Sequence, residues 1–268
     1  MARLERKLSL QTLSLGKHNP KLVELRKAIR AADLTPEGLL PIEGPRLFDE
    51  AVRSGIGIMD VFLRRGVGID APAKTPVYEL DEATFKSIQS TETSQGVIAL
   101  VRPRTFSLDE ILKAANPRIV VLVRLQDPGN VGTILRIAES FRATACIAVT
   151  GTVNIYNTKT VRASAGSVFR LPHVWNLDLD DVITRLKALK LFVVGTSPAA
   201  DSTIDAWDWR KPCAILVGNE GRGLTSDEAK KCDALLRIPQ NAAVDSLNSA
   251  IATAIILYEA SRHERIAV

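Results

Sequence analysis

Apolar residues in the first third of the chain alternate between helical spacing and short runs. In residues 21–30, Leu22, Leu25 and Ile29 recur on one helix face, so this segment is expected to be an amphipathic helix. Pro45 suits the first turn of a second helix at 46–54, and a third is expected at 81–90. Strands are expected at 39–42, 61–63, 76–80 and 96–101. This alternation predicts a small α/β unit.

The segment 102–106 combines proline with charge and has no periodicity, which is typical of a linker. Ser107 and Glu110 directly after it fit a capping box, which marks a helix start. From there on, strands are expected at 119–125, 145–149, 191–194, 214–217 and 234–238. Helices are expected at 131–141, 179–190 and 246–262, and another is expected to begin at a second capping box, 225–228. A long loop is expected after residue 149. Strands this apolar are buried on both faces, so the fold class is α/β with a parallel sheet. Domains are expected at residues 1–103 and 104–268.

The composition is that of a globular protein in a reducing compartment. Of the 268 residues, 46% are hydrophobic and 24% are charged, and the longest apolar runs have only strand length. Neither a membrane span nor a secretory signal is expected, and Glu5 within the short basic start argues against a transit peptide, so the expected location is the cytoplasm. Cys146 and Cys213 lie in or beside apolar runs and are expected to be buried thiols.

The charge distribution favours a phosphate-rich partner, but only weakly. The formal net charge is +5, and many cytosolic enzymes are as basic as this. Lys159, Arg162 and Arg170 cluster in one loop-rich segment, where they serve either as phosphate contacts or as a solvated face. The three histidines are scattered and no Cys/His spacing suits zinc, so no metal site is expected.

Three loops contain more of the residues that favour turns, Gly, Asn, Asp and Ser, than a simple connection requires. The first, at 126–132, follows a strand and precedes a helix that carries Arg136. Its alternative reading is a simple turn in which Asn130 caps the helix and Arg136 pairs with Glu139 on the surface. The loop lies at the carboxyl end of a parallel strand, where open α/β sheets bind ligands.

The second loop, at 218–223, has three glycines in the order G-x-x-G-x-G. A dinucleotide fingerprint has a different order and belongs after the first strand of its unit, and a P-loop needs a G-K-[ST] sequence that is absent. Binding of NAD or ATP is therefore not indicated, and a tight structural turn remains open. In the third segment Ser246 is the expected N-cap of a helix that is small and apolar almost all round, and Asn248 is either a first-turn polar residue or a ligand contact.

Taken in order, these segments resemble the three motifs of the SpoU family of RNA 2′-O-ribose methyltransferases, within the SPOUT superfamily. Motif one resembles residues 126–139, motif two 216–224 and motif three 238–259, and 156–172 is also similar to the family. Motif two carries Asn219 where Ser or Pro is common, and motif three carries Ser249 and Ala250 where Val-Ser or Val-Ala is common. Residues 42–51 and 93–97 are similar to the L30e-like RNA-binding domain often fused to this catalytic domain.

The resemblance implies a deep trefoil knot in the C-terminal domain, S-adenosylmethionine (AdoMet) as the methyl donor, and a homodimer whose site uses both subunits. It places donor binding in the loop after strand 191–194 and in motifs two and three. The implied donor-binding residues are Gly195, Thr196, Gly218, Asn219, Glu220, Gly223, Ile238, Ser246, Leu247 and Asn248.

The implied reaction is methylation of a ribose 2′-hydroxyl by a catalytic set of Arg136, Asn130, Glu220, Ser246 and Asn248. Arginine is effectively always charged, so we expect Arg136 to grip a phosphate and stabilise the developing alkoxide rather than act as a base. Asn130 is expected to orient Arg136 or the ribose. The other three position sugar and donor.

Ribosomal RNA of the 23S type is the first expected substrate and tRNA the second, with no membrane partner. A catalytically inert RNA-binding protein and an enzyme that methylates a base are the alternatives. The presence of Asn130, Arg136 and Asn248 argues against an inert protein, and the Asn…Arg…Glu order in motif one favours ribose.

Overall fold

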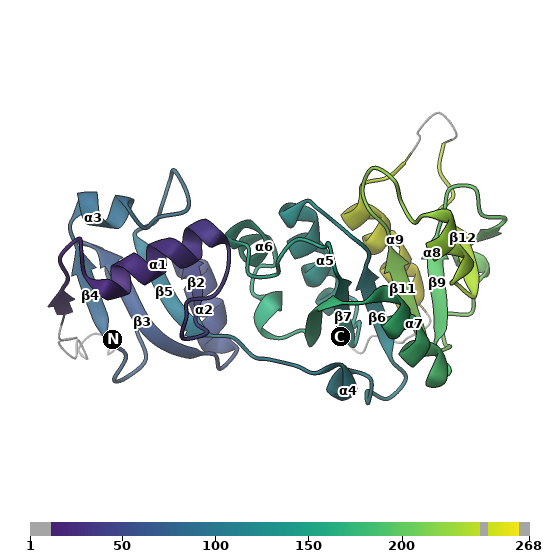
Figure 1. Cartoon of the computed structure of the whole chain (residues 1–268), viewed down its shortest axis with the longest axis horizontal. Helices are drawn as coiled ribbons and strands as arrows, with labels where there is room; N and C mark the ends of the chain where they lie inside the picture. Colours follow the sequence, from purple (N-terminus) through teal and green to yellow (C-terminus); the bar gives the residue numbers. More distant parts are fainter. Residues whose placement is uncertain (1–11, 242–245, 263–268) are drawn as a thin grey trace, which may run out of the picture. The chain divides into compact units, whose positions relative to one another are not determined.

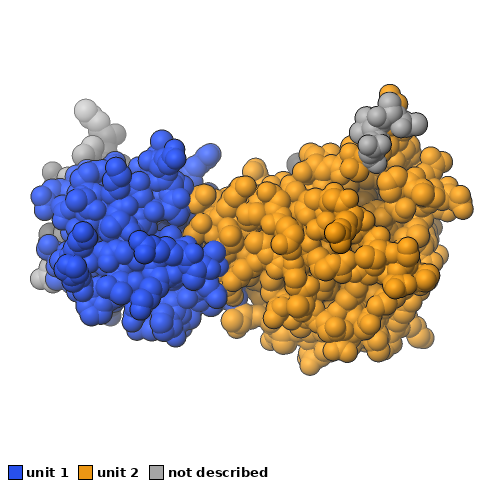
Figure 2. Space-filling model, turned by 45° about the horizontal axis from the view of Figure 1, so that its top comes forward, with its two compact units in different colours: residues 1–104 blue, residues 105–268 orange. Residues whose placement is uncertain are grey.

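The computed structural model describes residues 12–241 and 246–262. The chain divides into two compact units, Met1–Arg104 and Thr105–Val268 (Figure 2). Each unit has its own sheet and its own buried core.

Within residues 12–104, five strands form a mixed sheet in the order β1-β4-β3-β5-β2. The parallel part joins β1 (Thr12–Ser14), β4 (Val77–Leu80) and β3 (Gly57–Arg64), and the antiparallel part joins β3, β5 (Val97–Arg102) and β2 (Leu40–Glu43). The helices are α1 (Pro20–Ala31), α2 (Pro45–Arg53) and α3 (Glu82–Lys86). Helix α3 is shorter than the predicted 81–90, and the other predicted elements of this unit are present.

Helix α1 shows how the local sequence fixes these elements. The side chain of Asn19 accepts a hydrogen bond from the N–H of Lys21, and Pro20 occupies the first turn, where its missing N–H costs nothing. The predicted apolar face then packs Leu22 and Leu25 into the core that lines the sheet. The expected amphipathic helix is confirmed.

In the described part of the second unit, seven strands form a parallel sheet in the order β10-β12-β9-β11-β6-β7-β8 (Figure 1). Their bounds are β6 (Arg118–Leu122), β7 (Ala145–Val149), β8 (His173–Leu177), β9 (Phe192–Thr196), β10 (Ser202–Thr203), β11 (Cys213–Val217) and β12 (Ala234–Arg237). All residues of β6, β7 and β11 are buried, as the apolar runs predicted. The sheet is parallel and covered on both faces.

The helices of this unit are α4 (Leu108–Ile111), α5 (Pro128–Ser140), α6 (Thr158–Ala163), α7 (Leu179–Ala188), α8 (Ser226–Lys230) and α9 (Ser249–Ser261). Side chains of α4 and α7 pack with Ile119, Val121 and Leu216 in one core. Both predicted capping boxes are present, at Ser107 and at Thr225. Cys146 and Cys213 are free and buried, as expected.

The order of the strands in the sheet differs from their order in the chain. Strand β11 pairs with β6 on one side and β9 on the other, and both of these precede it. As a result, the carboxyl ends of β6, β9, β11 and β12 lie side by side, and the three loops singled out in the sequence leave from this edge.

The long loop expected after residue 149 is wrong. The segment contains α6, a short 3-10 helix at Ser167–Phe169 and strand β8. Helix α6 has six residues and is started by an Asn157 side chain that accepts from the N–H of Lys159. Strand β8 lies at the edge of the sheet and is only partly buried, so it lacks the apolar run that marks the central strands.

Gly132 allows α5 and α6 to approach closely. A Cβ at this position would lie 2.3 Å from the carbonyl oxygen of Thr160 and 2.6 Å from the Cβ of Ala163. We expect Gly132→Ala to lower the free energy of unfolding of the second unit by about 1–3 kcal/mol, because backbone has to shift.

Urea unfolding followed by tryptophan fluorescence measures this, because Trp175, Trp207 and Trp209 are the three tryptophans of the chain and all lie in this unit. Gly221→Ala is the control, since its Cβ would meet only the Asn219 side chain at 3.7 Å. Equal stability of the two variants would contradict the prediction.

Candidate functional site

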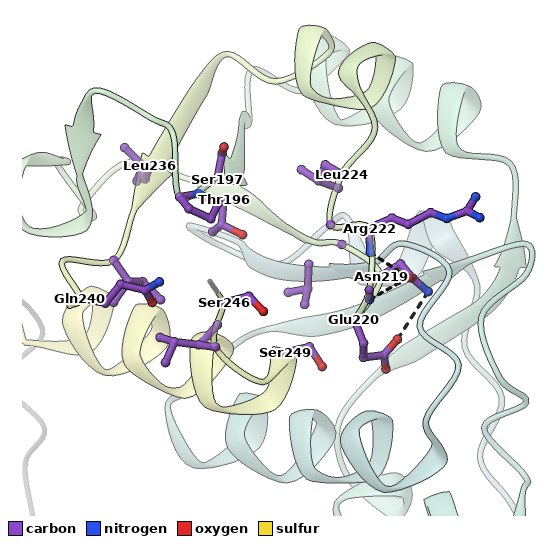
Figure 3. Close-up of a pocket in the computed structure, with 18 residues that line it drawn as sticks. Thr196, Ser197, Asn219, Glu220, Arg222, Leu224, Leu236, Gln240, Ser246 and Ser249 are labelled. Atoms are coloured by element: carbon purple, nitrogen blue, oxygen red, sulfur yellow. Dashed lines mark hydrogen bonds between the residues drawn. The ribbon is translucent and has the colours of Figure 1, made fainter. Parts of the chain in front are cut away.

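A pocket of about 300 Å³ opens where the loops after β9, β11 and β12 meet the start of α9 (Figure 3). Of the residues expected to bind a donor, eight line it: Thr196, Gly218, Asn219, Glu220, Gly223, Ile238, Ser246 and Leu247. The other lining residues were not among the expected donor-binding residues: Ser197, Pro198, Val217, Gly221, Arg222, Leu224, Leu236, Gln240, Ser249 and Ala252. The pocket is therefore built from three chain segments that are far apart in sequence.

The loop after β11 is a tight turn that requires glycine at positions 218 and 223. Asn219 and Gly223 exchange backbone hydrogen bonds of 3.1 and 2.8 Å, and Gly223 has a φ of 63°. A Cβ on Gly218 would lie 2.4 Å from the carbonyl carbon of Gly223. The side-chain oxygen of Asn219 accepts from the N–H groups of Gly221 at 3.0 Å and Arg222 at 3.3 Å. The turn thus forms one wall of the pocket from backbone.

Glu220 connects this turn to the loop of motif one. Its carboxylate accepts hydrogen bonds from the backbone N–H groups of Gln126 and Asp127, both at 3.2 Å. It also accepts from the side-chain amide of Asn130 at 3.4 Å. These bonds hold the two loops together, so the geometry gives Glu220 a positioning role.

Asn248 joins motif three to the same group. Its side-chain oxygen caps α9 by accepting from the N–H groups of Ala250 at 2.9 Å and Ile251 at 3.2 Å. Its side-chain amide donates to the side-chain oxygen of Asn130 at 3.0 Å. These hydrogen bonds, from Asn248 to Asn130 and from Asn130 to Glu220, form a network that connects all three motifs.

The expected cap of α9 is wrong, and so is the cap of α5 in the alternative interpretation of motif one. The N-cap of α9 is Asn248 and not Ser246, because helical backbone begins only at Ser249. Ser246 is exposed and lines the pocket. The N-cap of α5 is Asp127 and not Asn130, which leaves the Asn130 amide free to bond across to the other two motifs.

The carboxylate of Asp127 is stabilised in its charged form. The N–H of Asn130 donates to it at 2.7 Å, and Lys159 lies 3.5 Å away. The backbone hydrogen bond, with a smaller contribution from Lys159, lowers the pKa of Asp127 below its ordinary value. The start of α5 thus keeps its capping charge at neutral pH.

Arg124 supports the turn that lines the pocket, a role that sequence reasoning missed. Its backbone has a φ of 56°, and its carbonyl oxygen accepts from the side-chain amide of Asn219 at 2.9 Å. Its guanidinium binds both carboxylate oxygens of Glu228, one of them at 2.8 Å. Glu228 is buried and also accepts from the N–H of Thr225 in the capping box. The capping box is visible in the sequence, whereas its arginine partner lies in the loop after β6.

This ion pair shifts both groups toward their charged forms. Hydrogen bonding to Arg124 lowers the pKa of Glu228, and hydrogen bonding to Glu228 raises the pKa of Arg124. The pair links the end of β6 to α8, with the Asn219 turn between them.

Arg136 does not line the pocket of its own chain. It lies exposed on α5, and its side chain has no hydrogen-bond or ion-pair partner among the described residues. The alternative in which it pairs with Glu139 is wrong, because Glu139 binds Arg170 at 2.5 Å and the hydroxyl of Ser167. Burial raises the pKa of Glu139, but the hydrogen bonds from Arg170 and Ser167 outweigh it and bring the pKa below its ordinary value.

Gly195 contributes packing rather than pocket surface. A Cβ there would lie 2.7 Å from the sulfur of Cys232 and 2.8 Å from a methyl group of Leu235.

Among the described residues, no group of three His, Cys, Asp or Glu side chains could hold a metal ion. No helix in that part of the chain is both long enough and apolar enough to cross a bilayer.

A parallel α/β unit with a pocket at the carboxyl edge of its sheet defines a domain of the ligand-binding kind. Residues 117–258 match the SpoU rRNA Methylase family, and the chain belongs to this family. The second unit has the fold of SpoU methyltransferases, the trefoil-knot class that the motifs predicted.

The chain is similar to solved and curated members along nearly its whole length. The structure of an AdoMet-bound rRNA methyltransferase from Sinorhizobium meliloti has a TM-score of 0.82 and 31% identity and covers 95% of this chain and 99% of that one. The structure of the SpoU methyltransferase AviRb from Streptomyces viridochromogenes in complex with AdoMet has a TM-score of 0.80 and 26% identity. It covers 91% of this chain and 97% of that one. The 23S rRNA (guanosine(2553)-2'-O)-methyltransferase RlmP of Bacillus subtilis is 29% identical over 90% of this chain and 95% of that protein.

The Arg124–Glu228 pair predicts how stability depends on pH. Because the pKa of Glu228 is lowered by folding, its contribution is fully present above the ordinary value of 4.5 and is lost as pH falls through the lower folded value. Glu228→Gln keeps the capping side chain but removes the charge. We expect the free energy of unfolding to fall by roughly 1–2 kcal/mol at pH 7, a value discounted because Arg124 is partly exposed. Below pH 4.5 the difference in stability between the variant and wild type should shrink.

Urea unfolding at a series of pH values measures this difference. Asp227→Asn is the matched control, because Asp227 lies on the same helix in an exposed pair with Lys230 and should change stability by less than about 0.5 kcal/mol. A Glu228→Gln deficit that stays constant down to acid pH would show that charge is not its origin.

Proposed function

We propose that this protein is an AdoMet-dependent RNA methyltransferase that modifies a ribose 2′-hydroxyl, with ribosomal RNA as its substrate. The observation that carries the proposal is the Asn248–Asn130–Glu220 network, which unites the three motifs beside the pocket. Related proteins are named 23S rRNA 2′-O-methyltransferases, and solved relatives hold AdoMet. No observation favours tRNA, a base target or an inert binding module over this reading.

The pocket fits AdoMet in its size and in its chemistry. Its volume of about 300 Å³ lies at the lower end of the range for small-molecule sites. Gly218, Gly221 and Gly223 line the pocket and carry no side chain, so a ligand meets backbone there. Bound AdoMet would supply a methyl group made electrophilic by its positive sulfur. Thr196, the Asn219 turn, Ile238, Ser246 and Leu247 would hold it.

Arg136 is the proposed residue for the RNA side of the reaction. Its guanidinium stays charged and has no partner among the described residues, so it is available for a phosphate. Gripping the phosphate next to the target ribose would fix the sugar and stabilise the negative charge that develops on the 2′-oxygen as it loses its proton. Asn130, Glu220 and Asn248 would hold the loops that shape this site.

The position of Arg136 outside its own pocket supports a homodimer with a shared site. Helix α5, which carries Arg136, packs against α9 (Figure 1). The ring of Tyr258 on α9 contacts that of Phe141 at the end of α5. Ile251 and Tyr258 of α9 are 52% and 58% exposed. Covering this face with a second copy would bury them and bring Arg136 of one subunit toward the pocket of the other.

The first unit is proposed as the RNA-binding domain, of the L30e-like type that its sequence resembles. Contacts to sugar and phosphate would make RNA affinity sensitive to salt. Lys159 is a further phosphate contact on the second unit, whereas Arg170 is already bound to Glu139. With an RNA substrate of this kind, we place the protein in the cytoplasm.

Mapping of 2′-O-methyl groups in total RNA tests the function. A strain without the protein should lack one methylated ribose in its large-subunit rRNA, and wild-type protein should restore it. Arg136→Ala should restore less than about 1% of the methyl transfer while AdoMet affinity stays within twofold, because Arg136 does not line the pocket.

Lys113→Ala is the control, since it removes an exposed positive charge from the same unit. Restoration of the methyl group by Arg136→Ala would reject the role of this residue. An unchanged methylation map in the deletion strain would reject the function itself.

The shared site predicts that separating the subunits abolishes activity. Ile251→Glu places a charge in the proposed interface, so we expect a monomer by size-exclusion chromatography with light scattering and at least a tenfold loss of methyl transfer. Leu189→Glu is the control, because Leu189 is 51% exposed but lies at the end of α7. A fully active monomer would contradict the proposal.

A further inference from the structure

Buried hydroxyl groups in the second unit are nearly always hydrogen-bonded. The hydroxyl of Thr253 donates to the carbonyl oxygen of Ser249 at 2.7 Å, and that of Ser164 donates to Val161 at 2.7 Å. Within the described residues, two buried hydroxyls have no partner: Ser249 Oγ and Thr160 Oγ1. A buried polar atom without a partner is costly, so each of the two needs an explanation.

Ser249 differs from Thr160 in where it lies. Ser249 lines the pocket, whereas Thr160 lies on α6 beside Gly132 and is not part of the pocket wall. The Ser249 side chain is seen at the start of α9, between Ser246 and Glu220, with its oxygen on the side of Glu220 (Figure 3). Its residue is only 7% exposed, so bulk water reaches it poorly.

The place of Ser249 in the helix adds a second unpaired group. It is the first residue of α9, where a backbone N–H has no acceptor within the helix. Asn248 caps the N–H groups of Ala250 and Ile251 with its side chain. A hydroxyl and an uncapped N–H at one residue match a ligand that carries hydrogen-bonding oxygen or nitrogen atoms.

We infer that Ser249 is a binding residue for the cofactor, with its hydroxyl hydrogen-bonded to an oxygen or nitrogen atom of AdoMet. This inference rests on the proposed function, because it needs AdoMet in this pocket. The methyl-sulfonium group offers no hydrogen-bonding atom, so the contact belongs to the part of AdoMet that is shared with S-adenosylhomocysteine. The hydroxyl is unsatisfied in the protein alone and satisfied in the complex.

If Ser249 has this role, Ser249→Ala should leave the stability of the free protein unchanged or increased but should weaken ligand binding. Removing an unsatisfied hydroxyl should hold or raise the melting temperature of the protein without ligand. Losing one neutral hydrogen bond should raise the Kd for AdoMet about three- to tenfold, and the Kd for S-adenosylhomocysteine by the same factor. A residue that served only the fold would not weaken the binding of both ligands while leaving the melting temperature intact.

Isothermal titration calorimetry of the full chain with AdoMet and with S-adenosylhomocysteine, together with thermal melting without ligand, tests the inference. Thr160→Val is the matched control: it also removes an unsatisfied buried hydroxyl, but outside the pocket, so AdoMet affinity should stay within twofold.

Four results would overturn the inference. The first is Ser249→Ala binding AdoMet within twofold of a wild type that binds it, which leaves the proposed function standing. The second is Thr160→Val losing affinity to the same extent as Ser249→Ala. The third is Ser249→Ala weakening the binding of AdoMet but not of S-adenosylhomocysteine. The fourth is a wild type that binds no AdoMet, which removes the proposed function as well.

Discussion

The side-chain amide of Asn130 accepts a hydrogen bond from Asn248 and donates one to Glu220, and the rest of the site depends on this pair of bonds. An amide can do both at once because it carries an acceptor and donors on one planar group. Asp127 makes this possible by taking over the cap of α5. These cross-links join the loop of motif one, the turn at Asn219–Gly223 and the start of α9.

The site is assembled from backbone as much as from side chains. The turn at Asn219–Gly223 approaches Gly218 so closely that no Cβ fits there, and Arg124 holds the turn from the other side through its own carbonyl oxygen. The buried carboxylate of Glu228 in turn holds the partly exposed guanidinium of Arg124. Such a wall can accept a polar ligand with little rearrangement, which is the condition for positioning two reactants.

Sequence reasoning predicted most of this architecture for a physical reason. The central strands are buried on both faces, so they read as apolar runs, and the loops with functional residues carry Gly, Asn and Ser in excess. It missed α6 and the edge strand β8, because a six-residue helix and a half-exposed strand leave weak patterns. It placed the cap of α9 two residues early, since Ser246 and Asn248 are both good caps and only the path of the backbone decides between them. Partners such as Arg124 and Glu228, which are 104 positions apart, leave no local signal.

The insertion of β11 between β6 and β9 has a consequence for how the polypeptide acquires this shape. Two strands made earlier must leave a gap that a later one fills, so contacts of large sequence separation form late, and their loop-closure entropy slows the process. The cavity is lined by segments on both sides of β11 and by α9, so it is complete only when β11, β12 and α9 are all in place. After dilution from denaturant, the ability to bind ligand would therefore return more slowly than helical structure. The ligand would bind and stabilise only the completely folded molecules.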